Sequence, residues 1–381
     1  MHTFSPVSPL FKRSGRWFAV PSSAAGSISA SWAGASITFL FKGTILQLQT
    51  GPSTERRDRF NGGTPMIACS IESPSGTTTE TYNPDGSQLI TLFESVPTGD
   101  LNQPRIICVT LIDWASIFEV EAFLTPGCGD IEEPQIFQFT PSVEVLVIGD
   151  SISCGWTDGS KPSPLGCLDA FPFAMKRDVM HNIGLFVDLD LIAYPAITLV
   201  DPTEEEADAG GMLGMVSKFE HTSPWSSTLL EELPSQRKPS LVVIALGTND
   251  EAQDISPTRF AAAFHTLLSN IFHRYGPSIK HVCVLPPFVD LNDSDHGEEE
   301  TIASCFSSVV AALPKSLPTA SPDCVFHEIT LGVQLQTEET IDGLHPNVAG
   351  HQLLGSALSK QIVPLLRSCI GPSPRDVQCA Q

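Results

Sequence analysis

The stretch VEVLVIGDSISCG, residues 143–155, decides the fold class of the second part of this chain. Its opening, VEVLVIG, is an almost continuous apolar run, as expected of a parallel strand that is covered on both faces. The Gly-Asp-Ser that follows suits a tight turn from a strand into a helix. The pattern therefore predicts the first strand of an α/β sheet, with Ser151 in the turn at its carboxyl end.

Strands and helices alternate along the rest of the chain. Further strands are predicted at FVDLDLIAY, LVVIALG, KHVCVLP and CVFHEI, and helices at PFAMKRDVMHNI, PTRFAAAFHTLLSNIFHRY, ETIASCFSSVVAAL and NVAGHQLLGSALSKQIV. This alternation predicts an α/β domain over residues 142–381, with a doubly wound, flavodoxin-like parallel sheet and helices on both faces. Sheets of this kind bind their ligands beyond the carboxyl ends of the strands.

The first part of the chain has a different pattern. Short apolar or alternating runs, such as SITFLF, TILQLQT, MIACSIE and RIICVTLI, are separated by turn residues such as Pro84-Asp85-Gly86. Many short strands at this spacing predict an all-β sandwich or jelly roll over residues 1–127. Residues 128–141, in a stretch that contains proline and glycine, are the predicted linker between the two domains.

Composition and charge narrow the function classes. A hydrophobic content of 41% with 17% charged residues fits a globular protein. The net charge of -22 argues against binding to nucleic acid or to an anionic membrane, which both attract Lys and Arg. No apolar run approaches the ~20 residues of a membrane helix. The start shows no apolar stretch of a signal peptide, which predicts a cytoplasmic protein unless a leader precedes it.

Cysteine usage leaves the redox compartment open. The ten cysteines are scattered and form no CxxC pair or metal-like cluster, so the sequence predicts no metal site. Several lie in apolar, strand-like runs, where a buried free thiol is the simplest interpretation. Cys154 with Cys167, and Cys369 with Cys379, are the pairs that we consider for disulfides.

Three motifs carry candidate chemistry, each at or after a predicted strand. GDSISCG (residues 149–155) offers a serine, ALGTND (245–250) an asparagine amide, and DGLHPN (342–347) a carboxylate and an imidazole three residues apart. In a tight turn such a carboxylate can accept from the imidazole Nδ1–H and leave Nε2 to face a serine. Pro346 suits the first position of the following helix. Each motif alone is common as a cap or turn, but their combination is not.

This combination resembles the SGNH hydrolases, and the resemblance covers residues 143–365. It implies Ser151 as the nucleophile, His345 as its base and Asp342 as the residue that orients the base. It also implies an oxyanion hole made by the backbone N–H of Ser151, the Asn249 amide and a third donor. The family has a glycine at the third position, where the best match here, IAYPAITL, has Ala196. An alanine keeps the N–H but fits a positive φ less readily.

The two-domain layout, with GRW early and FEVEAFLTPG before the GDS motif, is similar to that of carbohydrate esterase family two. This resemblance implies a serine esterase that removes short acyl groups, above all acetyl, from a small-molecule or polysaccharide ester without a cofactor. In some members a backbone carbonyl replaces the triad acid. Two alternatives stay open, namely a broad esterase or lipase on non-sugar esters and an inactive carbohydrate-binding protein. Trp156 and Trp225 are candidates for a sugar-stacking surface, and the oligomeric state stays open.

Overall fold

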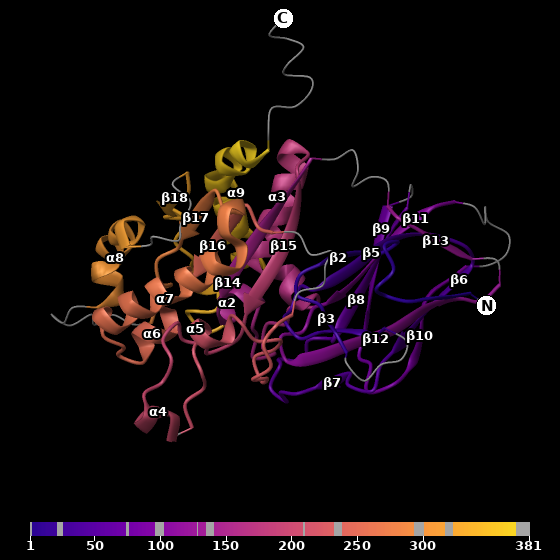
Figure 1. The fold of residues 1–381 in the computed structure, drawn as a ribbon, viewed down its shortest axis with the longest axis horizontal. Coiled ribbons are helices and arrows are strands. Elements are labelled where there is room, and N and C mark those ends of the chain that lie inside the picture. Colours follow the sequence, from indigo (N-terminus) through magenta and orange to yellow (C-terminus); the bar gives the residue numbers. More distant parts are fainter. Residues whose placement is uncertain are drawn as a thin grey trace, which may run out of the picture. The chain divides into compact units, whose positions relative to one another are not determined.

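The computed structural model describes residues 2–20, 26–73, 76–95, 103–127, 129–134, 141–208, 210–231, 238–292, 301–316 and 323–370. These residues fold into two compact units. Unit 1 comprises Met1–Phe139, Trp156–Leu168 and His221–Gln236, and unit 2 comprises Thr140–Gly155, Asp169–Glu220 and Arg237–Gln381. The ribbon in Figure 1 is coloured along the sequence, so both units can be followed by their labels.

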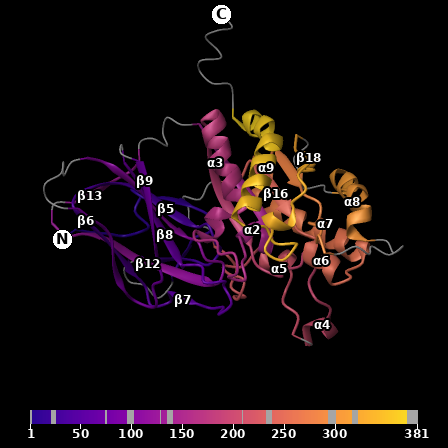
Figure 2. The ribbon, with the colours of Figure 1, turned by 180° about the vertical axis from the view of Figure 1, so that it is seen from behind.

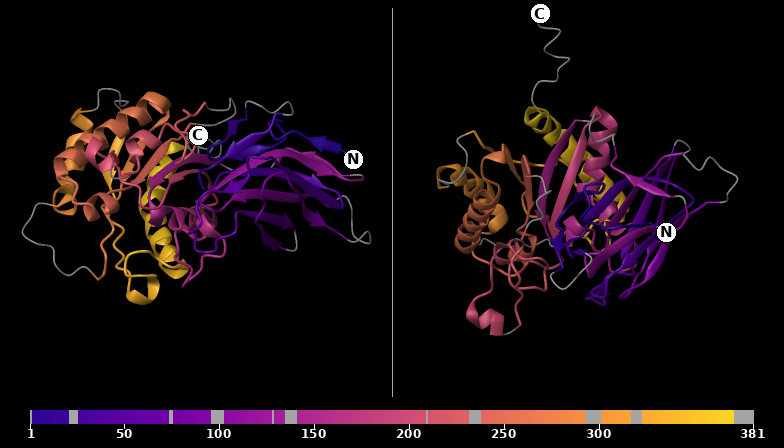
Figure 3. Two further views of the ribbon diagram at one scale, coloured as in Figure 1. Left: turned by 90° about the horizontal axis from the view of Figure 1, so that it is seen from below. Right: turned by 45° about the vertical axis from the view of Figure 1, so that its right-hand side comes forward.

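Unit 1 is an antiparallel β-sandwich, as the sequence predicted. Its strands are β1 (His2–Phe4), β2 (Lys12–Ser14), β3 (Phe18–Ala19), β4 (Ile28–Ala30), β5 (Ser36–Lys42), β6 (Ile45–Thr50), β7 (Glu55–Arg56), β8 (Ile67–Ser73), β9 (Gly76–Tyr82), β10 (Leu89–Glu94), β11 (Arg105–Leu111), β12 (Ser116–Thr125) and β13 (Asp130–Glu132). One sheet has the order β10-β6-β12-β4-β3, with β1 and β7 also pairing with β12. The other has the order β13-β5-β11-β8-β9, with β2 pairing with β5. Figure 3 draws the strands of this unit from two further sides.

Alternating side chains build the core of unit 1. In β6, ILQLQT, every second residue is buried, as expected of a strand with one face against a core. Aromatic rings fill the space at the centre, where the Phe39 and Phe123 ring centroids lie 4.8 Å apart in an edge-to-face arrangement. Strand β9, GTTTETY, is almost entirely exposed and lies at the end of its sheet.

Two segments outside residues 1–127 also belong to unit 1. The first, Trp156–Leu168, leads into the short helix η1 (Gly166–Asp169) and bonds to the sandwich through the Cys167 N–H and the Ile112 carbonyl at 3.0 Å. In the second, the carbonyl of His221 accepts from Trp32 Nε1 at 3.2 Å. The chain thus returns twice to the β-sandwich unit after the α/β fold has begun, whereas the predicted range 142–381 assigned both segments to the α/β domain.

The predicted linker, residues 128–141, is structured in part. Strand β13 lies within it and pairs antiparallel with β5. Residues 128 and 135–140 lie outside the described part of the chain. Cys154 and Cys167, one of the two pairs considered for a disulfide, are both buried, and neither forms a disulfide with a described residue. Cys379 also lies outside the described residues.

Unit 2 is the predicted doubly wound α/β fold. Its parallel sheet consists of β14 (Ser142–Gly149), β15 (Phe186–Ala193), β16 (Leu241–Ala245), β17 (His281–Val284) and β18 (Val325–Glu328), in the order β15-β14-β16-β17-β18. In order of sequence this is 2-1-3-4-5, the flavodoxin-like arrangement. Strand β16 is buried along its whole length, which explains its unbroken apolar sequence LVVIA.

Helices cover both faces of this sheet. The helices are α2 (Ser151–Cys154), α3 (Phe171–Ile183), α4 (Glu204–Asp208), α5 (Met215–Lys218), α6 (Thr248–Ala252), α7 (Pro257–Tyr275), η2 (Gly276–Ser278), α8 (Ile302–Ser316), η3 (Thr337–Glu339) and α9 (Val348–Cys369). Helix α3 packs side by side with α9, whereas α7 packs against α5 and α8 (Figures 1 and 2). The short acidic helix α4 stands out from the rest of the unit. No helix among the described residues is long and apolar enough to cross a membrane.

Helix α9 differs from the prediction at both ends. It begins at Val348 with Asn347 as its N-cap, so Pro346 lies before the helix and does not occupy its first position. The Asn347 side chain accepts from the N–H groups of Ala349 and Gly350. The helix also continues past Pro364 to Cys369. Lys360, whose carbonyl loses its partner because proline has no N–H, is exposed and open to water.

Candidate active site

The first component of the site is the turn that carries Ser151. Strand β14 ends at Gly149, and a Cβ there would collide with Ser153 Oγ, so the turn requires glycine at that position. Asp150 caps helix α2 by accepting from the N–H of Ile152 at 3.0 Å. Ser151 is the first residue of this helix, where backbone N–H groups have no acceptor within the helix.

The second component is the DGLHPN turn before α9. Asp342 Oδ1 accepts from the N–H groups of Leu344 at 3.0 Å and His345 at 2.8 Å. Gly343 has a φ of 100°, and a Cβ there would collide with the Asn292 side chain. Asn292 Nδ2 in turn donates to the Asp342 carbonyl at 2.7 Å. The turn is therefore held from within and from the loop after β17.

These two turns meet through side chains. His345 Nδ1 lies 2.7 Å from Asp342 Oδ2, and His345 Nε2 lies 3.0 Å from Ser151 Oγ. Ser151 is buried, and the His345 side chain is 17% exposed while that of Asp342 is 41% exposed. Partial burial opposes ionisation of Asp342. The N–H and the ring of His345, together with the Leu344 N–H, outweigh it and lower the pKa of Asp342 below its ordinary value.

The third component is Asn249, in helix α6 after β16. Asn249 Nδ2 donates one hydrogen bond to the Ile197 carbonyl at 2.9 Å. A primary amide has two N–H donors, so this bond fixes the side chain and uses one of them. Gly247, the N-cap of this helix, has a φ of 120°, a backbone conformation that favours glycine.

Ala196 adopts the backbone conformation that a glycine would favour. It is exposed and has a φ of 59°, and Ala196 and Asp254 are the two described non-glycine residues with a positive φ. It occupies the third position of a turn in which the Ile197 N–H bonds to the Tyr194 carbonyl at 3.4 Å, with Pro195 in second place. A positive φ at the third position after proline is typical of a type II turn, where glycine is the usual residue.

Asp250 is a positioning residue that the sequence did not single out. Its side chain is fully buried, and its two oxygens accept from the N–H groups of Leu199 at 2.8 Å and Val200 at 3.1 Å. Burial raises the pKa of Asp250, against the effect of these two N–H groups. Together with Asn249, it fastens the loop that contains Ala196 to the ALGTND motif.

Two further buried polar side chains lie close to these motifs in the sequence. Asp150 is buried, and among the described residues no donor reaches its Oδ2. Burial raises the pKa of Asp150 to about 7, against the Ile152 N–H and assisted by the charge of Asp250. His351 in α9 is buried, and neither ring nitrogen has a partner among the described residues. Burial, with the nearby His345, lowers the pKa of His351 to about 3, so it stays neutral.

The sequence-derived site residues therefore fall into two groups. The structure brings Ser151, His345 and Asp342 into one chain of hydrogen bonds. Asn249 and Ala196 lie at the carboxyl ends of β16 and β15, the two strands that flank β14. Trp156 and Trp225 are half-buried and belong to unit 1. Among the described residues, no three His, Cys, Asp or Glu side chains are placed to share a metal ion.

A serine, a histidine and a carboxylate in this order are the elements of nucleophilic catalysis. The sequence matches the GDSL-like Lipase/Acylhydrolase family over residues 210–353, a range that contains Asn249, Asp342 and His345 but not Ser151. Comparison with curated proteins gives no significant match.

Solved structures similar to this one share its two-domain layout. A family two carbohydrate esterase from Clostridium thermocellum, in complex with cellohexaose, has a TM-score of 0.69 at 19% identity, covering 94% of this chain and 100% of that one. One from Cellvibrio japonicus has a TM-score of 0.67 at 14% identity, covering 96% and 98%. An acetyl xylan esterase from Butyrivibrio proteoclasticus has a TM-score of 0.65 at 13% identity, covering 97% and 99%. Residues 210–353 of this chain are therefore similar to the GDSL-like Lipase/Acylhydrolase family, and its fold is similar to that of family two carbohydrate esterases.

Proposed function

We propose that this protein hydrolyses carboxylic esters through an acyl-enzyme formed on Ser151. The observation that carries the proposal is the continuous chain of hydrogen bonds from Asp342 through His345 to Ser151 Oγ, with lengths of 2.7 and 3.0 Å. Asp342 is ionised at neutral pH, because its pKa is lowered, and an ionised carboxylate accepts the Nδ1–H of His345. His345 Nε2 is then left as the acceptor for the serine proton.

In the first half of the proposed reaction, His345 Nε2 takes the Ser151 proton while Oγ forms a bond to the ester carbonyl carbon. The carbonyl oxygen becomes an oxyanion, which accepts from the N–H groups of Ser151 and Ala196 and from the second N–H of the Asn249 amide. When the bond to the alcohol oxygen breaks, His345 gives its proton to that oxygen. The acyl group stays on Ser151.

In the second half, a water molecule replaces the alcohol. His345 takes one proton from the water as the oxygen attacks the acyl carbon, and the same donors hold the oxyanion. The bond to Ser151 Oγ then breaks, and His345 returns the proton to the serine. The products are a carboxylic acid and the regenerated enzyme, so each turnover consumes one water and needs no cofactor.

For the substrate, we propose first a short acyl ester, above all acetyl, on a carbohydrate. Its support is the similarity of fold to an acetyl xylan esterase and to an esterase whose structure holds cellohexaose. A second candidate is a neutral ester with a larger apolar group, which an apolar cavity next to the DGLHPN turn favours. The chemistry on Ser151 is the same for both.

The proposed acyl-enzyme is tested by quenching the protein in acid during turnover of p-nitrophenyl acetate and measuring peptide masses. We expect one acetyl group on the peptide that contains Ser151, and none after Ser151→Ala. Acetate released from acetylated xylo-oligosaccharides would support the first substrate class. A protein that binds such sugars but releases no acetate and gains no acetyl group would be the carbohydrate-binding alternative.

A further inference from the structure

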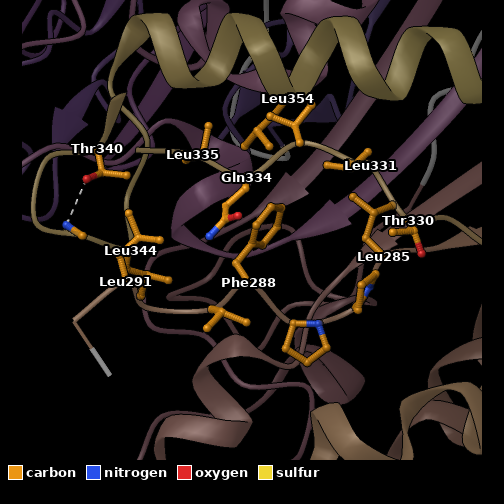
Figure 4. A pocket seen from close by; sticks show the side chains of 16 residues that line it. Leu285, Phe288, Leu291, Thr330, Leu331, Gln334, Leu335, Thr340, Leu344 and Leu354 are labelled. Atoms are coloured by element: carbon orange, nitrogen blue, oxygen red, sulfur yellow. Dashed lines mark hydrogen bonds between the residues drawn. The ribbon is translucent and has the colours of Figure 1, made fainter. Parts of the chain in front are cut away.

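Unit 2 contains an apolar cavity next to the proposed catalytic turn. It has a volume of about 550 Å³. Its walls come from the segments that follow β17 and β18, from the DGLHPN turn and from α9. In Figure 4 the side chains of Phe288 and Gln334 lie at the centre, with Leu354 above them on the helix. Cavities that hold drug-sized ligands have volumes of ~300–1,000 Å³, so this space is far larger than an acetyl group requires.

The cavity wall is bonded to both halves of the proposed site. Gly343 and Leu344, which line it, stand between Asp342 and His345 in the chain. The N–H of Leu291, which also lines the cavity, donates to the Gly343 carbonyl at 3.1 Å. The N–H of Phe288 donates to Thr248 Oγ1 at 3.0 Å, and Thr248 is the residue before Asn249. The cavity therefore lies between the turn of the proposed base and the helix of the proposed oxyanion donor.

The cavity is also close enough to Ser151 for one substrate to reach both. Strand β17 is two places from β14, which leads to Ser151, with β16 between them. Neighbouring strands are ~4.8 Å apart, so the carboxyl ends of β14 and β17 are separated by roughly 10 Å. An alkyl or aryl group attached to an ester at Ser151 can span this separation.

The lining chemistry selects for neutral, apolar groups. None of the described residues that line the cavity is charged, and most are Leu, Val, Pro or Phe. Two of the lining side chains, Val289 and Leu291, are 58% and 38% exposed, so apolar surface of the cavity is accessible to a ligand. Asp290 and Asp342 stand next to lining residues in the chain, and the net charge is -22, which disfavours a carboxylate or phosphate ligand.

We propose that this cavity holds an apolar alkyl or aryl group of a neutral ester whose carbonyl lies at Ser151. The proposal rests on the ester hydrolysis proposed above and assigns its second substrate class. The apolar group belongs either to the acyl part or to the alcohol part of the ester. Both sources have the same chemistry, and two substrate series tell them apart.

The test measures kcat/KM for the purified full chain on p-nitrophenyl esters of increasing acyl length and on acetates of increasingly long alkyl alcohols. Each buried methylene should raise kcat/KM about fourfold in the series whose group enters the cavity. Leu335→Trp, which fills the cavity, should flatten that series and leave methyl acetate, whose acyl and alcohol parts are both too small to fill the cavity, within about twofold of wild type. Met180→Trp changes an exposed apolar residue of α3 outside the cavity and should leave both series unchanged.

Binding of the neutral fluorescent probe N-phenyl-1-naphthylamine to Ser151→Ala separates this proposal from the esterase proposal, since it requires no turnover. Adding Leu335→Trp should weaken its binding at least tenfold. A rise along the acyl series assigns the cavity to the acyl group, and a rise along the alcohol series assigns it to the alcohol. Two results would overturn the proposal: kcat/KM that does not rise along either series although acetate esters are still hydrolysed, or probe binding that Leu335→Trp does not weaken. So would a wild-type dimer that Leu335→Trp converts to a monomer, because the cavity would then be an interface.

Discussion

Asp342 holds His345 at two points, because one carboxylate oxygen accepts the ring Nδ1–H at 2.7 Å and the other accepts the backbone N–H at 2.8 Å. The backbone bond fixes the turn, and the ring bond fixes the orientation of the imidazole. A single side chain therefore sets both where the proposed base stands and which nitrogen faces Ser151. This double contact distinguishes the proposed triad from an arrangement in which a backbone carbonyl orients the histidine.

Replacing Asp342 by Asn should lower kcat by about 10²–10⁴-fold with little change in KM. The asparagine amide cannot favour the Nδ1–H tautomer as a carboxylate does, and it does not stabilise a protonated ring. Steady-state kinetics on p-nitrophenyl acetate measure the effect. Asp254→Asn, which changes an exposed aspartate of the same unit at a φ of 52°, is the matched control. Near-wild-type activity of Asp342→Asn would show that Ser151 and His345 suffice.

Replacing Asn249 by Ala should lower kcat by about 10²–10³-fold, the usual effect of removing one oxyanion donor. KM should change little, since this donor acts mainly on the developing charge. Asn270 in α7 offers a matched control, because its amide also donates to a backbone carbonyl, that of Val216, at 3.4 Å. Asn270→Ala should cost comparable stability and no activity. Equal kinetic losses in both variants would assign Asn249 a structural role only.

Replacing Ala196 by Gly should keep or slightly raise thermal stability, by about 0–1 kcal/mol. An L-residue in the left-handed region costs about 1–2 kcal/mol, which glycine relieves, while the more flexible unfolded chain takes back about 0.5–1 kcal/mol. Activity should stay within about threefold, because the N–H is kept. Ala193→Gly in β15, where φ is not positive, should instead lower Tm. A loss of stability in Ala196→Gly as large as that of Ala193→Gly would contradict this interpretation of the turn.

Replacing His351 by Phe or Leu should stabilise unit 2, by about 1–3 kcal/mol at neutral pH, since a buried ring without partners is exchanged for an apolar group. The folded pKa of about 3 lies below the unfolded value of ~6.5, so the unfolded chain binds the proton more readily. Wild-type stability should therefore fall as the pH drops from about 6.5 towards 3, and less so in the variants. Thermal melts at several pH values measure this, with the exposed His273→Leu as control. Variants less stable than wild type at every pH would reveal an unseen partner for His351.

The apolar strands and the order of the motifs could be predicted because their signals are local. LVVIA is buried along its whole length and VEVLVIG is buried except at Glu144, so both sequences are nearly continuous apolar runs, and the chemistry follows directly at their ends. Strand β9, GTTTETY, was missed because it lies exposed at a sheet end and carries no apolar pattern. The sequence placed the end of helix α9 before Pro364, because proline normally breaks a helix. In the structure the helix continues, and Pro364 lies on its exposed face.

Other features depend on contacts between distant segments, which no local pattern records. Asp250 can position the loop at Leu199 only because this loop, distant in the sequence, folds back onto α6. The same holds for the segment at His221, which joins the β-sandwich through Trp32 although its sequence lies within the α/β domain. The apolar cavity is built from four separate segments of unit 2, so its residues could not be grouped from the sequence.

Ester turnover by Ser151→Ala, beside Ser153→Ala, tests the central claim most directly. Both serines are buried in α2, but Ser153 Oγ has no partner among the described residues while Ser151 Oγ lies 3.0 Å from His345 Nε2. If Ser151 is the nucleophile, kcat on p-nitrophenyl acetate should fall by several powers of ten in Ser151→Ala and stay near wild type in Ser153→Ala. Near-wild-type turnover by folded Ser151→Ala would contradict the account.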